Sequence, residues 1–510
     1  MSAAAAESES STDATPPSSQ ASKQPAAGFL RHAAVYGVGA VAIQMVSILL
    51  LPLYARWLTP AEYGVLQLLY RVGDVLNICL MVGGIQLAAI NFWGKASSDR
   101  ERRHVAATIA WLTGVVLIAS LVVMMLCSQT LARQLNLYDD YANAGQLLAF
   151  GIFAMMLQAT TVMPLALMQA RMESTAYLFA SISIAISQLA TVAIALVVFD
   201  AGVWGVIIAM ASTFAVFGIL LTIREFSKSS PVPDMQLLWK IVAFSLPFIP
   251  SGLFFFVLHS GDQFFLINYY DAATLGIYAL AYRVAKGVTT FASGPLMQVW
   301  TAKMYDVHRQ PDRSFEFGKI YSRILLGFVL GGVAVVMFQD EALALLSSDK
   351  FVDSASLIAP LILAHYFLIF ANLMDGAFYV ERRTDMKPWI AAASTVVMLL
   401  AYWMLIPRYA ATGAAWASLI GFVFHWGITT VLAQRVFFVK LEYWRIGASL
   451  AAAIAVAVCG RQIADQTMLK ALLFFLLLAA FWLTGIISSE EKQTVFRLIN
   501  RGWIGRIRFR

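Results

Sequence analysis

The sequence predicts an all-α, polytopic membrane protein with fourteen transmembrane helices, arranged as two pseudo-symmetric six-helix lobes followed by two C-terminal helices. Hydrophobic residues make up 60% of the 510 residues, charged residues only 13%, and the mean hydropathy is +0.74. Soluble domains are nearer half apolar and a quarter charged. The apolar stretches are also much longer than the alternating segments of about ten residues in an outer-membrane barrel. A sequence pattern that occurs twice predicts the two lobes.

Each transmembrane helix needs about 20 predominantly apolar residues. Fourteen segments of the chain meet this requirement. Their expected limits are 33–55, 65–93, 104–130, 142–169, 174–198, 202–223, 241–268, 275–302, 318–339, 354–379, 388–406, 411–434, 443–460 and 467–488.

The loops between these segments predict the orientation. If the N-terminus is cytoplasmic, the inner loops carry most of the lysines and arginines, including Lys95, Arg100, Arg102 and Arg103. Outer loops carry acidic residues such as Asp139. This asymmetry follows the positive-inside rule and predicts that both termini are cytoplasmic. A net charge of +7 therefore reflects membrane orientation, and no nucleic-acid partner is expected.

The predicted domains follow from these spans. Residues 1–30 are rich in Ala, Ser and Pro and are expected to be a disordered tail. A basic segment at 489–510 is expected to form an interfacial helix on anionic inner-leaflet lipids. Between them we expect an N-terminal lobe (31–224), a cytoplasmic linker (225–240), a C-terminal lobe (241–436) and two additional helices (437–488).

The two lobes are predicted from an internal repeat. Residues 53–72, LYARWLTPAEYGVLQLLYRV, match residues 265–284, FLINYYDAATLGIYALAYRV, at a constant offset. The identical pairs are Ala61/Ala273, Gly64/Gly276, Leu68/Leu280, Tyr70/Tyr282, Arg71/Arg283 and Val72/Val284. Arg171 and Arg383 recur at the same offset. Both copies follow an outward-running span, so the halves are related by an axis along the membrane normal.

Charged residues within the predicted spans are the strongest functional candidates, because intramembrane charges are costly and usually face a wet cavity. They form three i,i+3 pairs, each on one helix face: Arg71 and Asp74, His259 and Asp262, Arg283 and Lys286. All six are expected in the outer half of the membrane.

The cations of this set predict an anion site. Arg71, Arg283 and Lys286 are expected to hold a phosphate or pyrophosphate, and Asp74, His259 and Asp262 to balance charge or carry a coupling cation, Na+ or H+. In an alternative interpretation the two arginines extend towards the membrane surface and the carboxylates only neutralise or cap their helices.

Helix breakers are concentrated in the seventh predicted span. Pro247, Pro250 and Gly252 lie within FSLPFIPSG. Each proline removes a backbone hydrogen bond and favours a bend. We therefore expect a gate or hinge at these residues.

Several kinds of site are not expected. The three cysteines, Cys79, Cys127 and Cys459, are scattered in apolar stretches and suggest neither a disulfide framework nor a metal site. The sequence has no GxxxxGK[ST] phosphate-binding loop and no large domain outside the membrane. We expect no cofactor and no direct use of ATP.

The repeated stretches LPLYARWLTPAEYGVLQLLYRV and LGIYALAYRV resemble Wzx-type flippases of the polysaccharide transporter family, within the multidrug/oligosaccharidyl-lipid/polysaccharide exporter superfamily. The resemblance implies a bacterial inner-membrane transporter that moves an undecaprenyl-pyrophosphate-linked oligosaccharide outwards by alternating access. Polysaccharide polymerase and export machinery are implied partners. Asp262, in GDQFF, resembles an aspartate that is commonly followed by arginine in this family, but Gln263 follows here.

Two other functions remain open. A membrane-embedded polymerase or lipid-dependent glycosyltransferase would need a substantial outer domain, and the outer loops are short. An exporter of cationic drugs would need carboxylates or aromatic residues in its cavity without an excess of cations. A flippase of peptidoglycan precursor remains an alternative, because that lipid carries the same pyrophosphate.

Overall fold

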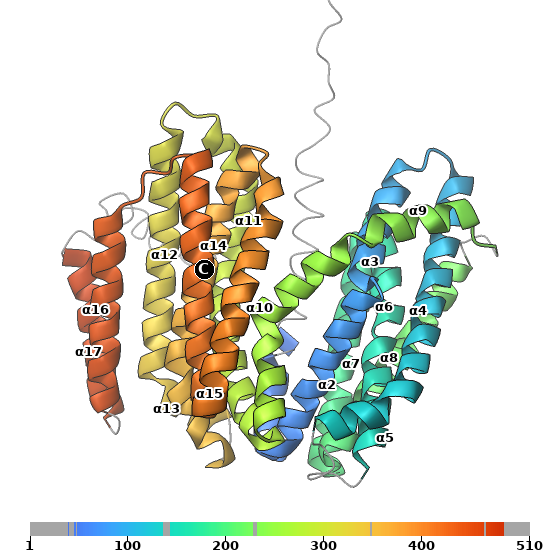
Figure 1. The fold of residues 1–510 in the computed structure, drawn as a ribbon, viewed down its shortest axis with the longest axis horizontal. Helices are drawn as coiled ribbons and strands as arrows, with labels where there is room; N and C mark the ends of the chain where they lie inside the picture. The colour runs from blue at the N-terminus through green and yellow to red at the C-terminus, as the bar shows by residue number, and fades with distance from the viewer. Residues whose placement is uncertain are drawn as a thin grey trace, which may run out of the picture.

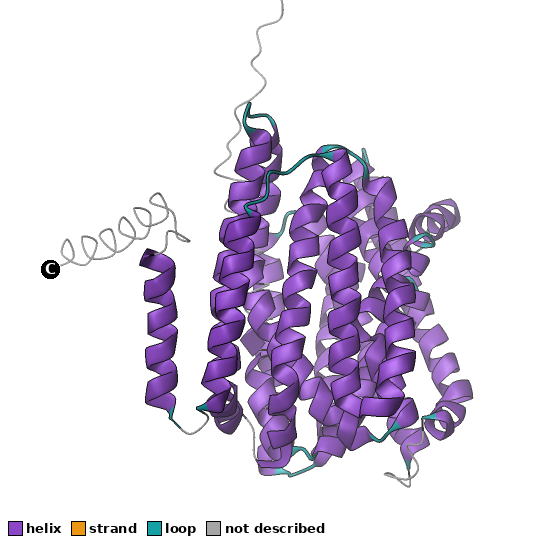
Figure 2. Cartoon of the chain, turned by 60° about the vertical axis from the view of Figure 1, so that its left-hand side comes forward, coloured by secondary structure: helices purple, strands orange, loops and turns teal. Residues whose placement is uncertain are grey.

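The computed structural model describes residues 39, 45–46, 48–135, 143–227, 232–346, 349–463 and 466–483. These residues form helices joined by short loops, and no strand occurs among them (Figure 2). The predicted tail at 1–30 and the predicted interfacial helix at 489–510 lie outside the described residues.

The helices follow one another with few interruptions. After an apolar helix over Ile48–Trp57, they are α2 (Pro60–Cys79), α3 (Val82–Lys95), α4 (Asp99–Gln134), α5 (Ala144–Leu157), α6 (Ala159–Ala170), α7 (Ser174–Ala193), η1 (Ile194–Val198), α8 (Gly202–Phe226), α9 (Met235–Ser245), α10 (Phe248–Tyr269), α11 (Ala272–His308), α12 (Arg313–Met337), α13 (Gln339–Leu346), η2 (Asp349–Ser354), α14 (Ala355–Val380), η3 (Thr384–Met386), α15 (Lys387–Val436), α16 (Tyr443–Gln462) and α17 (Thr467–Leu483).

Many of these helices are suited to crossing a membrane. Within the described residues, 8 helical stretches are long and apolar enough, some of them made of two consecutive elements such as α5 with α6 or α9 with α10, and the count is 9 when the pair α2 and α3, bent by 47°, is one span. Helix α15 is 50 residues long and breaks at Ala410 (φ 50°), between two predicted spans. The predicted class of all-α polytopic membrane protein is confirmed, and the count of fourteen spans stays a prediction.

Two bundles make up the molecule (Figure 1). Helices α2 to α8 form one bundle, and α11 to α15 form most of the other, with α16 and α17 at its far edge. Helix α9 packs on α3 and α4, whereas α10 packs on α15 and α2. The predicted domain limits stay predictions, but the chain passes from one bundle to the other between α9 and α10.

The break between α9 and α10 coincides with the predicted helix breakers. Helix α9 ends at Ser245, and Pro247 is the N-cap residue of α10. Proline is well accommodated in a first helical turn, where its missing N–H has no intrahelical partner. A Cβ atom at Gly252 would lie 3.0 Å from Cγ2 of Ile78, so α10 passes close to the end of α2. The role of this break as a gate stays a prediction.

The two bundles meet where the repeated stretches begin. In α2, Thr59 and Glu62 form a capping box around Pro60, and in α11 the Asp271 carboxylate accepts from the Thr274 N–H at 2.7 Å. These caps start both helices at matching positions of the repeat.

Matching glycines bring α2 and α11 into close contact. A Cβ atom on Gly64 would overlap the carbonyl oxygen of Ala272, and one on Gly276 would overlap that of Pro60. Small residues permit such close approach of helix backbones. We call this contact the glycine seam. In Figure 1 the bundles meet at this lower end and their helices spread apart towards the upper end.

Candidate functional site

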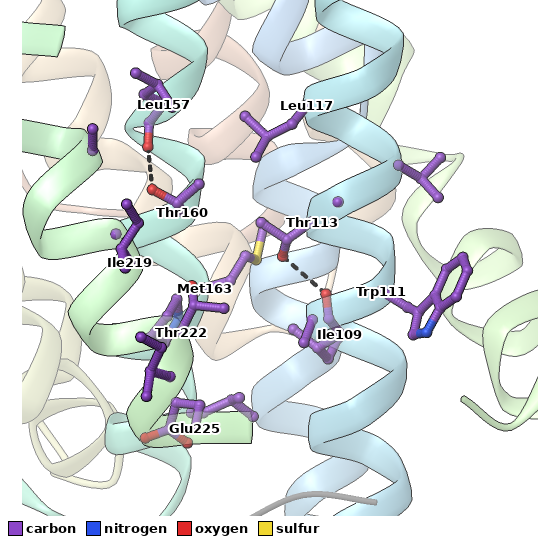
Figure 3. Close-up of a pocket in the computed structure, with 18 of the residues that line it drawn as sticks. Ile109, Trp111, Thr113, Leu117, Leu157, Thr160, Met163, Ile219, Thr222 and Glu225 are labelled. Carbon is purple, nitrogen blue, oxygen red and sulfur yellow. Dashed lines mark hydrogen bonds between the residues drawn. The ribbon is translucent and has the colours of Figure 1, made fainter. Parts of the chain in front are cut away.

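One cavity lies outside the seam, within the first bundle. It has a volume of about 580 Å³ and lies between α4 and α8, over α6 (Figure 3). Side chains such as Leu117, Leu157 and Ile219 line it. Glu225 at its end is paired with Arg171 at 2.6 Å. This cavity suits hydrocarbon and offers little to a charged headgroup.

A second cavity, of about 290 Å³, lies between the bundles and is far more polar. We call it the basic cavity. Helices α2, α10 and α11 provide its polar side chains, which are Gln67, Tyr70, Arg71, Gln263, Tyr282, Arg283, Lys286 and Thr290. The structure thus brings together all three cations that the sequence assigns to an anion site. Their binding role stays a prediction.

Arg71 is held by neighbours on both sides of the bundle interface. Its Nη1 lies 2.8 Å from Oδ2 of Asp74 on the same helix. The same nitrogen donates a 2.8 Å hydrogen bond to the Ser260 hydroxyl on α10. Asp74 therefore neutralises Arg71, as the alternative interpretation of the sequence expects. The Nε atom of Arg71 is buried without a hydrogen-bond partner, so the guanidinium retains one free donor.

Arg283 is the repeat counterpart of Arg71, but no carboxylate pairs with it among the described residues. Tyr54, Tyr63 and Tyr70 are polar neighbours of its guanidinium. Lys286 occupies the position that matches Asp74 and has no ion-pair partner in the described part of the chain. The second copy thus has Lys286 where the first has Asp74, so Arg283 and Lys286 both face the basic cavity without a carboxylate partner among the described residues.

Two buried amides complete the basic cavity. Gln67 is 4% exposed and Gln263 is 3% exposed, yet Nε2 of Gln67 and Oε1 of Gln263 have no hydrogen-bond partner within the described residues. Buried polar groups are normally paired, so such groups suggest an absent ligand or water. Sequence reasoning missed both glutamines. The signal for Gln67 was its position one helical turn before Arg71.

Asp262 does not line the basic cavity. It is 1% exposed and lies in the C-terminal bundle. The Tyr278 hydroxyl donates to its Oδ2, the backbone N–H of Gln263 donates to its Oδ1 at 2.9 Å, and the Ser418 hydroxyl lies 3.4 Å from Oδ2. No cation pairs with this carboxylate among the described residues.

His259 lies one turn before Asp262 on α10. Its Nδ1 lies 2.9 Å from the Phe255 carbonyl oxygen, and the Tyr282 hydroxyl donates to the His259 carbonyl at 2.7 Å. Tyr282 also lines the basic cavity, so it connects the backbone of His259 with that cavity. The proposed roles of Asp74, His259 and Asp262 in charge balance or ion coupling stay predictions. No group of three His, Cys, Asp or Glu side chains suited to a metal ion occurs in the described ranges.

Comparisons with known proteins agree with this architecture. A family model described as "Polysaccharide biosynthesis protein" matches residues 53–356. No curated protein matches the chain in sequence.

Solved structures share the fold. The lipid II flippase MurJ, in an inward closed conformation, superposes with a TM-score of 0.71 at 10% identity, over 90% of this chain and 99% of that chain. An inward-facing multidrug resistance MATE family transporter of the MOP superfamily gives 0.63 at 15% identity, over 80% and 95%. A MATE structure in complex with MaD3S gives 0.53 at 15% identity, over 82% and 96%. The fold is therefore that of multi-pass membrane transporters.

Proposed function

The chain belongs to the polysaccharide biosynthesis protein family, and on this premise we propose that it is a Wzx-type flippase. Its cargo is an oligosaccharide linked to undecaprenyl pyrophosphate, which it moves across the bacterial inner membrane for surface or exopolysaccharide synthesis. Polysaccharide polymerase and export machinery would act on the product at the outer face.

The observation that carries this proposal is the pair of cations without carboxylate partners, Arg283 and Lys286, in one cavity between the bundles. Charges without partners at membrane depth are expensive to maintain, which favours a functional role. A pyrophosphate would supply the missing anion. Arginine binds phosphate oxygens through two parallel hydrogen bonds, and lysine adds a point charge.

Alternating access would follow from the arrangement of the bundles. The glycine seam holds them together at one end, and their helices spread apart at the other. With the predicted orientation, the seam lies at the outer face and the spread end faces the cytoplasm. The cargo would then enter the basic cavity from the inner leaflet, and separation of α2 from α11 would release it outwards.

Asp262 is the residue that we propose for ion coupling. The carboxylate is 1% exposed and has no cationic partner among the described residues, so burial favours its binding a proton or a cation, although hydrogen bonds from Tyr278 and the Gln263 N–H partly stabilise the charge. Binding or release there would reach the basic cavity through Gln263, whose backbone N–H donates to Asp262.

A flippase of peptidoglycan precursor is the second candidate function. The fold shared with lipid II flippase MurJ favours it, and that cargo presents the same pyrophosphate to Arg283 and Lys286. Export of cationic drugs fits less well, because the basic cavity repels cations.

The test is flipping in proteoliposomes of an undecaprenyl-pyrophosphate-linked oligosaccharide, with lipid II in a parallel series. We expect flipping of the oligosaccharide lipid, and at least a tenfold lower rate for Arg283→Gln and Lys286→Gln, since a hydrogen bond to a charged group contributes about 1.5–3 kcal/mol. Arg309→Gln, at an exposed residue beyond α11, is the matched control. Full activity in both cavity variants would exclude the proposed site, and flipping of lipid II alone would establish the second candidate.

A further inference from the structure

A third cavity, of about 350 Å³, lies inside the N-terminal bundle beside the basic cavity. We call it the amide cavity, because four glutamines line it: Gln86, Gln158, Gln169 and Gln188. Tyr70 and Arg283 line both cavities, so the two are neighbours that meet at these side chains.

The polar lining follows regular helix faces. Gln158, Thr161 and Gln169 recur along α6 at spacings that keep them on one side of the helix. On α7, Ser181 and Gln188 are seven residues apart, or about two turns. Two helices thus present polar faces to the same space, which an apolar packing interface would not require.

One polar group of the lining is buried without a partner among the described residues. The Ser181 hydroxyl is buried, at 2% exposed, and makes no hydrogen bond within the described residues. The side chains of Gln158 and Gln188 are exposed or half-buried and line the same cavity. Buried polar groups are paired in most structures, so the unpaired Ser181 hydroxyl, in a cavity lined by four side-chain amides, indicates a polar ligand.

We propose that the amide cavity is the glycan subsite, which binds the uncharged sugar next to the pyrophosphate. This inference rests on the proposed function. A side-chain amide both donates and accepts hydrogen bonds, as does a sugar hydroxyl or acetamido group. Arg283, at the boundary, would hold the pyrophosphate while the first sugar extends into the N-terminal bundle.

Apart from Arg283, the polar groups of the amide cavity are uncharged, and this indicates which class of sugar it binds. Gln86, Gln158, Gln169 and Gln188 carry no charge, and Arg283 is the cation at the boundary. A carboxylated sugar would lose its hydration without a dedicated cation, which is costly. We therefore expect neutral, hydroxyl-rich or N-acetylated sugars at this position.

The test compares two soluble probes that share a lipid and a pyrophosphate. Farnesyl pyrophosphate reports on the basic cavity, and farnesyl-pyrophosphate-linked N-acetylglucosamine reports on both cavities. We expect the double variant Gln158→Leu/Gln188→Leu to bind the sugar probe about tenfold more weakly, the loss of one to two hydrogen bonds, with binding of farnesyl pyrophosphate changed less than twofold. Ser181→Ala should give a smaller loss with the same selectivity. Gln236→Leu, at an exposed position of α9, is the matched control.

The outcomes separate the two proposals. Wild-type-like binding of both probes by the double variant would overturn the glycan subsite alone. An equal loss for both probes would also overturn it, because the glutamines would then act on overall structure. If the wild-type protein binds neither probe, the proposed function fails as well. Equally tight binding of a glucuronic acid probe would overturn the assignment to neutral sugars.

Discussion

The two copies of the repeat share the seam glycine and the arginine but carry opposite charges one turn after the arginine. Both place a glycine at the seam, Gly64 or Gly276, and an arginine about two turns later, Arg71 or Arg283. The next turn carries Asp74 in the first copy and a lysine in the second. The shared residues build the contact between the bundles, whereas the divergent residues leave one arginine neutralised and the other available.

The interiors of the two bundles differ in polarity. At the repeat offset, Gln158 and Thr161 of the amide cavity correspond to Phe370 and Leu373. Both C-terminal residues are 2% exposed, and Phe370 packs on Tyr366 with ring centroids 4.0 Å apart. An apolar core thus replaces a polar cavity. Two lobes with one framework are expected to differ in this way when they enclose one asymmetric cargo.

Reversing the divergent charge should have the largest effect. Lys286→Asp would give Arg283 the carboxylate neighbour that Arg71 already has. We expect the affinity for farnesyl pyrophosphate to fall at least about 100-fold, because one cation is lost and a second is neutralised. Equilibrium binding measures this, with Lys350→Asp at an exposed position as the control. An affinity for farnesyl pyrophosphate within threefold of wild type would contradict the claim that this charge difference creates the anion site.

Substitution of either glycine of the seam should destabilise the protein by a similar amount. Gly64→Ala and Gly276→Ala each introduce a Cβ atom against a backbone carbonyl, and overpacking of this kind costs about 1–3 kcal/mol. Unfolding in mixed micelles should show similar losses for the two variants. Gly327→Ala is the control, since no atom lies within 4 Å of its added Cβ. A loss for only one glycine would contradict a pseudo-symmetric contact.

Loss of the buried Asp262 carboxylate should weaken ion coupling without weakening the binding of farnesyl pyrophosphate. Asp262→Asn keeps the size of the side chain and its contact with Tyr278 but cannot bind a coupling ion as a carboxylate. We expect the stimulation of flipping by an imposed sodium or proton gradient to fall about tenfold. Binding of farnesyl pyrophosphate should stay within twofold. Stimulation as in the wild type would exclude Asp262 as the coupling residue.

The smallest effect is expected at the first copy of the divergent position. Asp74 is 46% exposed in its side chain, and partly exposed ion pairs contribute at most about 1 kcal/mol. Asp74→Asn should release Arg71 and strengthen binding of farnesyl pyrophosphate by no more than about fivefold. Weaker binding would show that the carboxylate supports the site by positioning Arg71.

The sequence allowed much of this architecture to be predicted, because long apolar segments and the repeat are local signals. The meeting of Arg71, Arg283 and Lys286 followed from the repeat and from their depth. The hydrogen bond of Arg71 to Ser260 on α10 did not follow, since it depends on how the bundles pack.

The amide cavity could not be predicted either. A glutamine in a span is as consistent with a contact between helices as with a ligand. Only the assembled helices show that Gln158 and Gln188 line a common cavity.

The central claim is that the charge difference between the two copies creates the pyrophosphate site. Flipping of the oligosaccharide lipid in proteoliposomes by Arg71→Gln and Arg283→Gln, at equal protein levels, tests it most directly. The unequal pairing of the two arginines predicts at least a tenfold loss for Arg283→Gln and a clearly smaller loss for Arg71→Gln, because Asp74 already neutralises Arg71. Equal losses, or a larger loss for Arg71→Gln, would contradict it.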